Sequence, residues 1–192
     1  MASYRAGSPE DVATMLGKNP KIESLVVPNS LKGWGDVNEL SRSASTGEPH
    51  AGGTMNTQTW HLARPGEDAV FVGGQPDSSG KRIETEYQGG GTATPHISPL
   101  SILQHANRIR QATGNSPRAN LGLWVNPDIA DNKRGIDVDA STGVATESEA
   151  IDLMKTRPSE EGAWSMKKMA ENDGDGYVPN PAYDPNTVKP SH

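Results

Sequence analysis

Residues 98–140 read SPLSILQHANRIRQATGNSPRANLGLWVNPDIADNKRGIDVDA and contain a helix pattern followed by two strand patterns. The helix begins at Ser98-Pro99, because a hydroxyl side chain caps a first turn and proline fits the first helical position. Gly114 follows the last turn, as glycine often does where a helix ends. Short apolar runs bounded by turn residues predict strands over 120–125 and 136–140. A helix followed by two adjacent strands predicts an α+β domain.

The residues on either side extend this domain. Thr146 to Glu149 have the spacing of a capping box, which is typical of a helix N-terminus. Two short strand patterns, 59–62 and 69–72, flank a Pro-Gly turn and predict a hairpin. Residues 163–169 fit a strand or a helix, and we favour a strand. We therefore expect a small, mostly antiparallel sheet with two main helices over residues 59–170.

The two ends of the chain differ in composition from this middle part. Residues 8–17 predict a short helix and 22–27 a short strand, whereas 41–58 contain Met55 as their only large apolar residue. Four prolines after Glu171 favour an extended path. We therefore divide the chain into an N-terminal arm with one short helix and a short strand (1–58), an α+β domain (59–170) and a Pro-rich extended tail (171–192), so that long extended arms flank the domain.

The apolar content is low for a chain that must also order two arms. Leu, Ile, Val and Phe together number 30 in 192 residues, whereas Gly and Pro number 36. Trp34 lies between two glycines, which is typical of an anchor that fills a neighbour's pocket; packing against its own domain is the alternative. We expect neighbouring molecules to cover the arms. The expected partner-binding residues are Leu31, Trp34, Val37, Leu40, Met55, Tyr177 and Tyr183.

Charge and cysteine content exclude several classes of protein. The formal net charge of -6 argues against nucleic-acid binding through net charge alone. Without cysteine the chain forms no disulfide, thiolate zinc site or thiol nucleophile. It contains no apolar run long enough to cross a bilayer and begins without the apolar segment of a secretory signal. We expect synthesis in a host cytoplasm, no membrane partner, and neither a cofactor nor a metal.

Two loops resemble known binding loops without matching them. Gly74 to Lys81 resembles a phosphate-binding loop, but its spacing is wrong by one residue and no helix pattern follows, so we predict a turn. Residues 171–176 place acidic side chains as a calcium loop does, but Ala182 takes the place of the bidentate glutamate, which excludes an EF-hand. Five basic residues form either a solvated surface, which is the commoner case, or a local basic face that contacts nucleic acid or phosphate: Arg108, Arg110, Arg118, Lys133 and Arg134.

Histidines and aspartates are the residues from which a catalytic site would be built. Asp137 and Asp139 alternate on one face of a predicted strand, where they form either a carboxylate pair or an ordinary solvent-facing edge. His61, His96 and His105 lack the spacing of a zinc-binding helix. An enzyme would gather these residues into one cleft. The sequence assigns none of them a catalytic role.

One likeness runs from Trp60 to Met166, about half of the chain. Besides the helix at Ser98 it is carried by VGGQPD (72–77), GKRI (80–83), LGLWVNP (121–127), IDVDAS (136–141) and Glu149-Ala150. This pattern resembles a module of actinobacterial and actinobacteriophage proteins. The resemblance implies a phage or actinobacterial context and supplies no catalytic signature.

These observations favour a structural or accessory protein of a bacteriophage virion, in particular a minor head-associated or decoration subunit. Its partners would be other virion proteins or copies of itself. Extended arms suit such an assembly, because many small contacts add up once neighbouring copies are held close together. The alternative is a toxin-like or hydrolytic enzyme domain that uses His and Asp residues. A non-enzymatic role in the virion is the preferred hypothesis.

Overall fold

The computed structural model describes residues 25–48, 50–89, 95–126 and 135–187, which form a seven-stranded antiparallel sheet and four α-helices. This confirms the α+β class and the mostly antiparallel sheet, and it adds one main helix, α2, that the sequence pattern does not predict. The helices are α2 (Leu31–Ala44), α3 (Pro99–Ala112), α4 (Glu147–Met154), α5 (Met166–Glu171) and the 3-10 helix η1 (Pro185–Thr187). The strands are β1 (Gly52–Asn56), β2 (Val70–Val72), β3 (Glu86–Gly89), β4 (Ala119–Asn126), β5 (Gly135–Val144), β6 (Gly162–Ser165) and β7 (Tyr177–Pro179).

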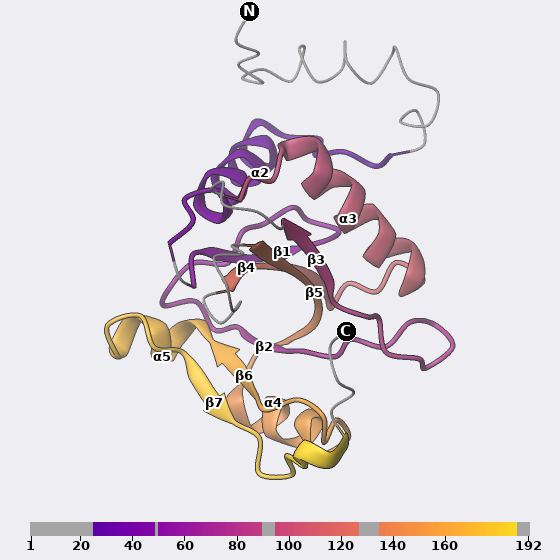
Figure 1. Ribbon diagram of the computed structural model, residues 1–192, viewed down its shortest axis with the longest axis vertical. Coiled ribbons are helices and arrows are strands. Elements are labelled where there is room, and N and C mark those ends of the chain that lie inside the picture. Colours follow the sequence, from indigo (N-terminus) through magenta and orange to yellow (C-terminus); the bar gives the residue numbers. More distant parts are fainter. Residues whose placement is uncertain (1–24, 49, 90–94, 127–134, 188–192) are drawn as a thin grey trace, which may run out of the picture.

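Strand β5 lies at the centre of the sheet. The strand order is β1-β4-β5-β2-β6-β7, and β3 pairs with the first part of β5. Along one side, β4 pairs with β5 from Asn126 opposite Gly135 to Ala119 opposite Thr142. Along the other side, β3 and β2 pair with the two ends of β5. Figure 1 shows β4, β5 and β2 following one another around a curve.

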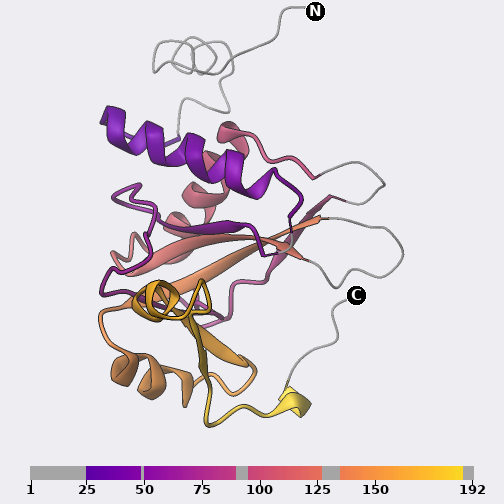
Figure 2. The same cartoon turned by 90° about the vertical axis from the view of Figure 1, so that its left-hand side faces the viewer.

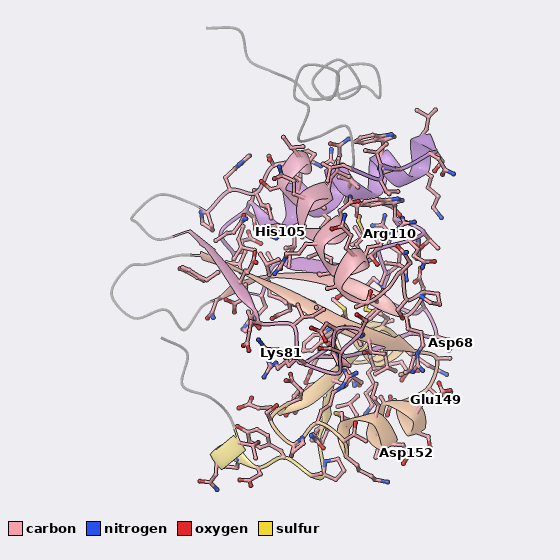
Figure 3. The ribbon with its side chains drawn as sticks, turned by 90° about the vertical axis from the view of Figure 1, so that its right-hand side faces the viewer. Asp68, Lys81, His105, Arg110, Glu149 and Asp152 are labelled. Atoms are coloured by element: carbon pink, nitrogen blue, oxygen red, sulfur yellow. The ribbon has the colours of Figure 1, made fainter. Side chains whose placement is uncertain are left out.

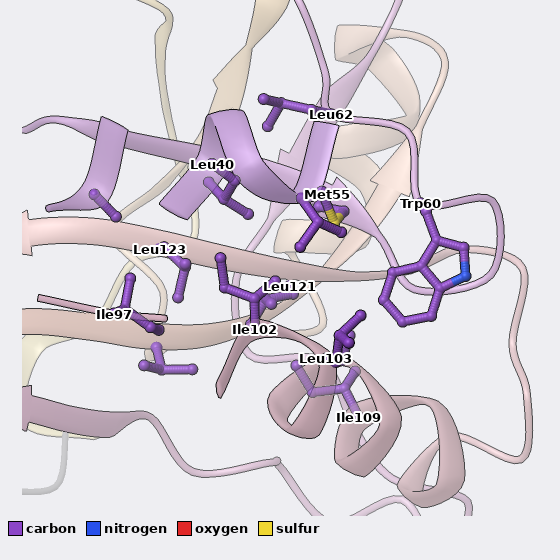
Figure 4. Packing of buried hydrophobic residues seen from close by; sticks show 14 of the residues in the cluster. Leu40, Met55, Trp60, Leu62, Ile97, Ile102, Leu103, Ile109, Leu121 and Leu123 are labelled. Carbon is purple, nitrogen blue, oxygen red and sulfur yellow. The ribbon is translucent and has the colours of Figure 1, made fainter. Parts of the chain in front are cut away.

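The first hydrophobic core lies between the sheet and helices α2 and α3, which Figure 2 shows together above the strands. Leu121 and Leu123 on β4 alternate toward these helices, as period-two burial requires. The α3 stripe predicted from the sequence forms, and the Ser98 hydroxyl accepts a hydrogen bond from the Ser101 amide. Figure 4 shows how closely Leu40 and Met55 pack with the residues of β4 and α3.

A second, smaller core lies under α4. It contains Val70 and Val72 of β2, together with Ala150 and Met154 of the helix. The predicted capping box is confirmed: Thr146 accepts from the Glu149 amide, and the Glu149 carboxylate accepts from the Thr146 amide. The segment 163–169, predicted as a strand, changes type within its length, since β6 ends at Ser165 and α5 follows directly.

The face of the sheet opposite the first core carries polar and aromatic side chains. Trp124 on β4 and Trp164 on β6 have ring centroids 5.9 Å apart, although β5 and β2 lie between their strands. Neighbouring strands are about 4.8 Å apart, so a flat sheet would hold β4 and β6 roughly 14 Å apart. The contact therefore accords with the curl of the sheet that Figure 1 shows.

Residues 41–58 do not form the extended arm that we predicted. They contain the end of α2 and the whole of β1, which pairs with β4 from Gly52 opposite Trp124 to Asn56 opposite Asn120. Composition does not reveal this strand, because β1 is held by backbone pairing and by a single buried apolar side chain, Met55, next to the buried Thr54. A Cβ on Gly52 would lie 1.8 Å from the Leu123 carbonyl oxygen, so glycine allows the two backbones to approach. Residues 25–58 thus belong to the same domain as 59–170, in contrast to the predicted boundary.

The hairpin predicted between 59–62 and 69–72 is wrong. The chain turns after β1 and pairs back on it: Ala63 donates from its amide to the Thr54 carbonyl at 2.9 Å, and Leu62 bridges Met55. Residues 70–72 do form a strand, β2, but its partners are β5 and β6. The Pro-Gly pair at 65–66 therefore lies in a connection and not in a hairpin turn.

Two asparagines fasten the ends of the described chain. Asn107 on α3 accepts from the Val26 amide at 2.9 Å and donates to the Val26 carbonyl at 2.7 Å. Residues 25–27, the described part of the strand predicted over 22–27, therefore lie along α3 without strand pairing; the helix predicted over 8–17 lies outside the described residues. In the tail, β7 pairs with β6, and the buried Asn180 donates to three carbonyls near the end of α4.

The placement of α2 is tested by comparing two leucines of that helix. Leu40 is 0% exposed and Leu31 is 77% exposed. Leu40→Ala leaves a cavity and should lower the free energy of unfolding by about 2–5 kcal/mol, whereas Leu31→Ala should change it by less than about 0.5 kcal/mol. Urea denaturation followed by circular dichroism measures both. Equal effects would contradict the packing of α2 against the core.

The role of Asn180 is tested by Asn180→Ala. This substitution leaves the carbonyls of Met154, Arg157 and Glu160 without their common donor. The Met154 and Arg157 carbonyls keep a backbone donor. The free energy of unfolding should fall by about 1–3 kcal/mol through the loss of the three hydrogen bonds of Asn180. Asn186→Ala is the matched control, because Asn186 is an exposed amide of the same tail. A tail that lay free of the domain would make the two variants indistinguishable.

Candidate functional site

An open cleft of about 550 Å³ lies on the polar face of the sheet. Asn56, Asn120, Gly143 and Phe71 contribute to it from four strands that are neighbours or near neighbours in the sheet. Figure 3 shows Asp68 and Glu149, two further lining residues, on the same side of the molecule. The other lining residues are Thr59, His61, Ala63, Glu67, Ala69, Pro117, Arg118, Val144 and Ala145.

Arg118 is fixed in this cleft by its contacts with Gly143. The Gly143 amide donates to the Arg118 carbonyl at 2.8 Å, and Arg118 Nε donates to the Gly143 carbonyl at 3.1 Å. The absence of a side chain at 143 keeps the space open, because a Cβ there would lie 2.9 Å from Asn120 Nδ2 and 3.5 Å from a Phe71 ring carbon. The cleft thus has an arginine held by its Nε and an aromatic wall.

His61 lies at the cleft in a group of charged side chains that joins α2 to residues 61–67. Its Nε2 lies 2.9 Å from Glu67 Oε1, and its Nδ1 lies 3.6 Å from Asp36 Oδ2. The buried Asp36 also accepts from the Leu62 amide and from Arg64 Nη2. Both ring nitrogens of His61 thus face carboxylates of the protein itself. This arrangement holds a helix against a loop.

Asp139 belongs to a second polar group, at the gap in the edge of β5 between β3 and β2. Asp139 accepts from the Thr85 hydroxyl, and Arg82 Nη2 lies 2.9 Å from Glu160 Oε1 in an ion pair. Arg157 donates to the Gly73 carbonyl at 2.7 Å and to the Thr142 hydroxyl at 2.8 Å. We call Arg82, Asp139, Arg157 and Glu160 the arginine–carboxylate cluster.

Burial changes the acidity of this cluster. Desolvation raises the pKa of Asp139 and of Glu160 above the usual carboxyl range, although Arg82 opposes it in both cases. Desolvation also lowers the pKa of Arg157 to about 10. The Glu160 carboxylate lies so close to the backbone that a Cβ on Gly73 would be 2.4 Å from Oε2. The cluster therefore joins the loop after β2, β5 and the loop after α4.

The residues named for catalysis do not share one site. Asp137 accepts from Asn126 Nδ2 at 2.8 Å, whereas Asp139 binds Thr85. Burial raises the pKa of Asp137 as well. His105 lies on α3, where its Nδ1 is 3.2 Å from Glu86 Oε2 and burial lowers its pKa. His96 is exposed, and of these residues only His61 lines the cleft.

Four of the seven residues predicted to bind partners are buried in the protein's own core. Trp34, Val37, Leu40 and Met55 all belong to the first hydrophobic core, which corrects their predicted role. Three of them, Trp34, Val37 and Leu40, have helical spacing along α2. Sequence reasoning missed this signal because the other residues of the buried face, such as Ser41 and Ala44, are small. Packing of Trp34 against its own domain is thus the alternative that the structure bears out.

The other three predicted partner-binding residues are accessible. Leu31 opens α2 and is 77% exposed. Tyr177 on β7 is 46% exposed, although its hydroxyl donates to the Glu161 carbonyl. Tyr183 is half-buried and donates to the Glu161 carboxylate. Val26, 42% exposed, lies just before α2 and extends the apolar surface at that end of the domain.

The remaining motifs have structural explanations. Residues 76–82 form a turn closed by the Pro76–Arg82 bridge, in which the Asp77 carboxylate accepts from the Ser79 and Lys81 amides, so the predicted turn is confirmed. Arg108 pairs with Glu86, Arg110 binds Asn115, and Lys133 and Arg134 lie outside the described residues. Within the described ranges, no three His, Asp or Glu side chains are grouped for a metal, and no helix is long and apolar enough to cross a membrane.

The raised pKa of the half-buried Asp139 predicts a pH dependence of stability. The folded state holds the proton of Asp139 more tightly than the unfolded chain does, because the pKa of Asp139 is raised on folding. Protonated Asp139 therefore adds to the free energy of unfolding, and this stabilisation is fully present below the unfolded carboxyl pKa of about 3.9. That contribution is lost as the pH rises through the folded pKa. Asparagine stays neutral, so Asp139→Asn should gain stability relative to wild type as the pH rises through this window.

Urea denaturation at pH steps between about 3.5 and 7 measures this difference. Asp152→Asn, on the exposed face of α4, gives the baseline for loss of a surface carboxylate. If Asp139→Asn and Asp152→Asn change the free energy of unfolding by the same amount at every pH, the pKa of Asp139 is not raised in the folded state.

No protein-family model matches the chain, and neither a curated protein nor a solved structure is similar enough to match it. The resemblance to a module of actinobacterial and actinobacteriophage proteins stays a prediction. The function therefore has to be argued from the geometry of the residues themselves.

Proposed function

We propose that the protein is a non-catalytic subunit of a bacteriophage virion, a minor head-associated or decoration protein. The observation that carries this proposal is the exposure of Leu31, at the start of α2, five residues after the exposed Val26. Burial of a leucine side chain contributes about 1.5–3 kcal/mol, so contact with a neighbour would strengthen association. The phage context comes from the resemblance of residues 60–166.

The mode of attachment differs from the one expected from the sequence. Residues 31–58 are not available as an arm, because α2 and β1 are packed into the domain. We define residues 25–31 as the entry segment; Val26 and Leu31 face outward from it, whereas Leu25 and Val27 pack against the first core. Asn107 holds both backbone groups of Val26, and the Ser30 hydroxyl caps α2, so the entry segment has a fixed path. A neighbour would meet an ordered apolar surface.

The ordered entry segment favours binding through a preformed surface. It does not favour binding that is coupled to folding of an arm. A segment that is already held in place does not lose conformational entropy when a partner arrives, and this loss is the main cost for extended arms. The charged residues proposed for an enzyme favour the same conclusion. They hold separate elements together: His61 joins α2 to a loop, and Asp139 lies in the arginine–carboxylate cluster.

The proposal is tested by Leu31→Asp in the full chain. Particles are purified by density gradient from cells that express the phage genome and a tagged copy of the chain, and the incorporated copy is quantified by mass spectrometry. Wild type should be present, and Leu31→Asp should reduce incorporation at least about tenfold, since loss of about 1.4 kcal/mol weakens binding by that factor.

Gln104→Asp is the matched control, because it adds the same charge at an exposed position on α3. It should be incorporated as wild type is. Absence of the wild-type chain from the particles would refute a virion role. Equal incorporation of Leu31→Asp would refute attachment through the entry segment.

A further inference from the structure

We infer that the cleft beside Arg118 binds a small zwitterion, either a free amino acid or a short peptide with both termini free. This inference is independent of the virion role, because the cleft and the entry segment share no residue. The volume of about 550 Å³ is in the range of small-molecule sites, roughly 300–1,000 Å³.

Arg118 supplies the group that would bind a carboxylate. Its Nε is occupied by the Gly143 carbonyl, and this contact fixes the plane of the guanidinium. Within the described residues its two terminal nitrogens have no hydrogen-bond or ion-pair partner. Two parallel N–H groups held in one plane match the two oxygens of a carboxylate. The arginine is therefore prepared for a bidentate contact.

Asp68 and Glu149 supply the opposite charge. Asp68 is exposed and has no partner in the described part of the chain. Glu149 uses Oε2 to cap α4, and among the described residues Oε1 has no hydrogen-bond partner. Among the described residues, neither carboxylate forms an ion pair with Arg118, although all three line one cleft. Unpaired charges of both signs in one cleft match a ligand that carries an ammonium group and a carboxylate.

The cleft also has an apolar wall. Phe71 presents a half-buried ring and Ala69 is a further apolar lining residue, whereas the Val144 side chain packs in the second core. Gly143 leaves room above this ring, since a Cβ there would approach it to 3.5 Å. An apolar side chain between two charged ends would therefore contact Phe71. This feature favours an amino acid or dipeptide with an aromatic or aliphatic side chain.

The probes are phenylalanine and glycylphenylalanine, with two blocked forms of the dipeptide. The amide removes the carboxylate, and the N-acetyl form removes the ammonium group. Titration calorimetry with the full chain should show saturable binding of at least one unblocked probe. Arg118→Gln should weaken its binding at least about tenfold, the effect of about 1.4 kcal/mol, and should leave binding of the amide unchanged. Asp68→Asn should weaken the unblocked probe and leave the N-acetyl form unchanged.

Three further variants separate the cleft from general effects. Gly143→Ala narrows the cleft and should abolish binding, while the thermal unfolding midpoint shows whether the variant is folded. Arg110→Gln and Asp152→Asn remove the same charges outside the cleft and should bind as wild type does (Figure 3). If neither phenylalanine nor glycylphenylalanine shows saturable binding up to millimolar concentration, the inference is overturned. The same loss in Arg110→Gln as in Arg118→Gln also overturns it.

Discussion

The pairing of β4 with β5 is the interaction on which the rest of the structure depends. β5 is ten residues long and is in contact with three strands, so the positions of β3 and β2 are both set by its register. Alternate residues of β5 serve both cores: Ile136 and Val138 lie in the first, and Val144 lies in the second. A shift of one residue would turn these side chains to the polar face. One strand therefore aligns both halves of the domain.

Polar side chains hold together segments that buried apolar side chains would hold together in a sequence with more apolar residues. Asn107 replaces a strand partner for Val26, and Asn180 replaces a helix cap below α4. Arg157 satisfies backbone carbonyls where β2 ends. Each of these side chains is buried or half-buried, and each binds a segment distant in sequence. These hydrogen bonds fix the positions of the segments but add little to the free energy of unfolding. A buried hydrogen bond mainly prevents the loss of stability that a buried, unpaired polar group would cause.

Sequence patterns predicted the elements that carry their own local signal. The Ser98 helix has a cap and an apolar stripe, and the Thr146 box has both reciprocal partners, so α3 and α4 were predictable. β1 was not, because GGTMN is held by close backbone approach at Gly52, which composition does not reveal. The cleft was also beyond prediction. Its residues come from loops, helix α4 and four strands whose register is set only by tertiary pairing.

Because of the low apolar content, we expected the ends of the chain to need contacts with neighbouring molecules in order to adopt a fixed structure. Residues 25–58 and 171–187 do not need such contacts. Both segments are tied to the domain by strand pairing and by buried amides. In the proposed virion role, a subunit that is already ordered in these segments would lose little conformational entropy on joining an assembly. Its affinity then depends on a few exposed side chains and on shape, as in interfaces between preformed partners. Selection for assembly would act on positions such as Leu31, and selection for folding would act on the amides.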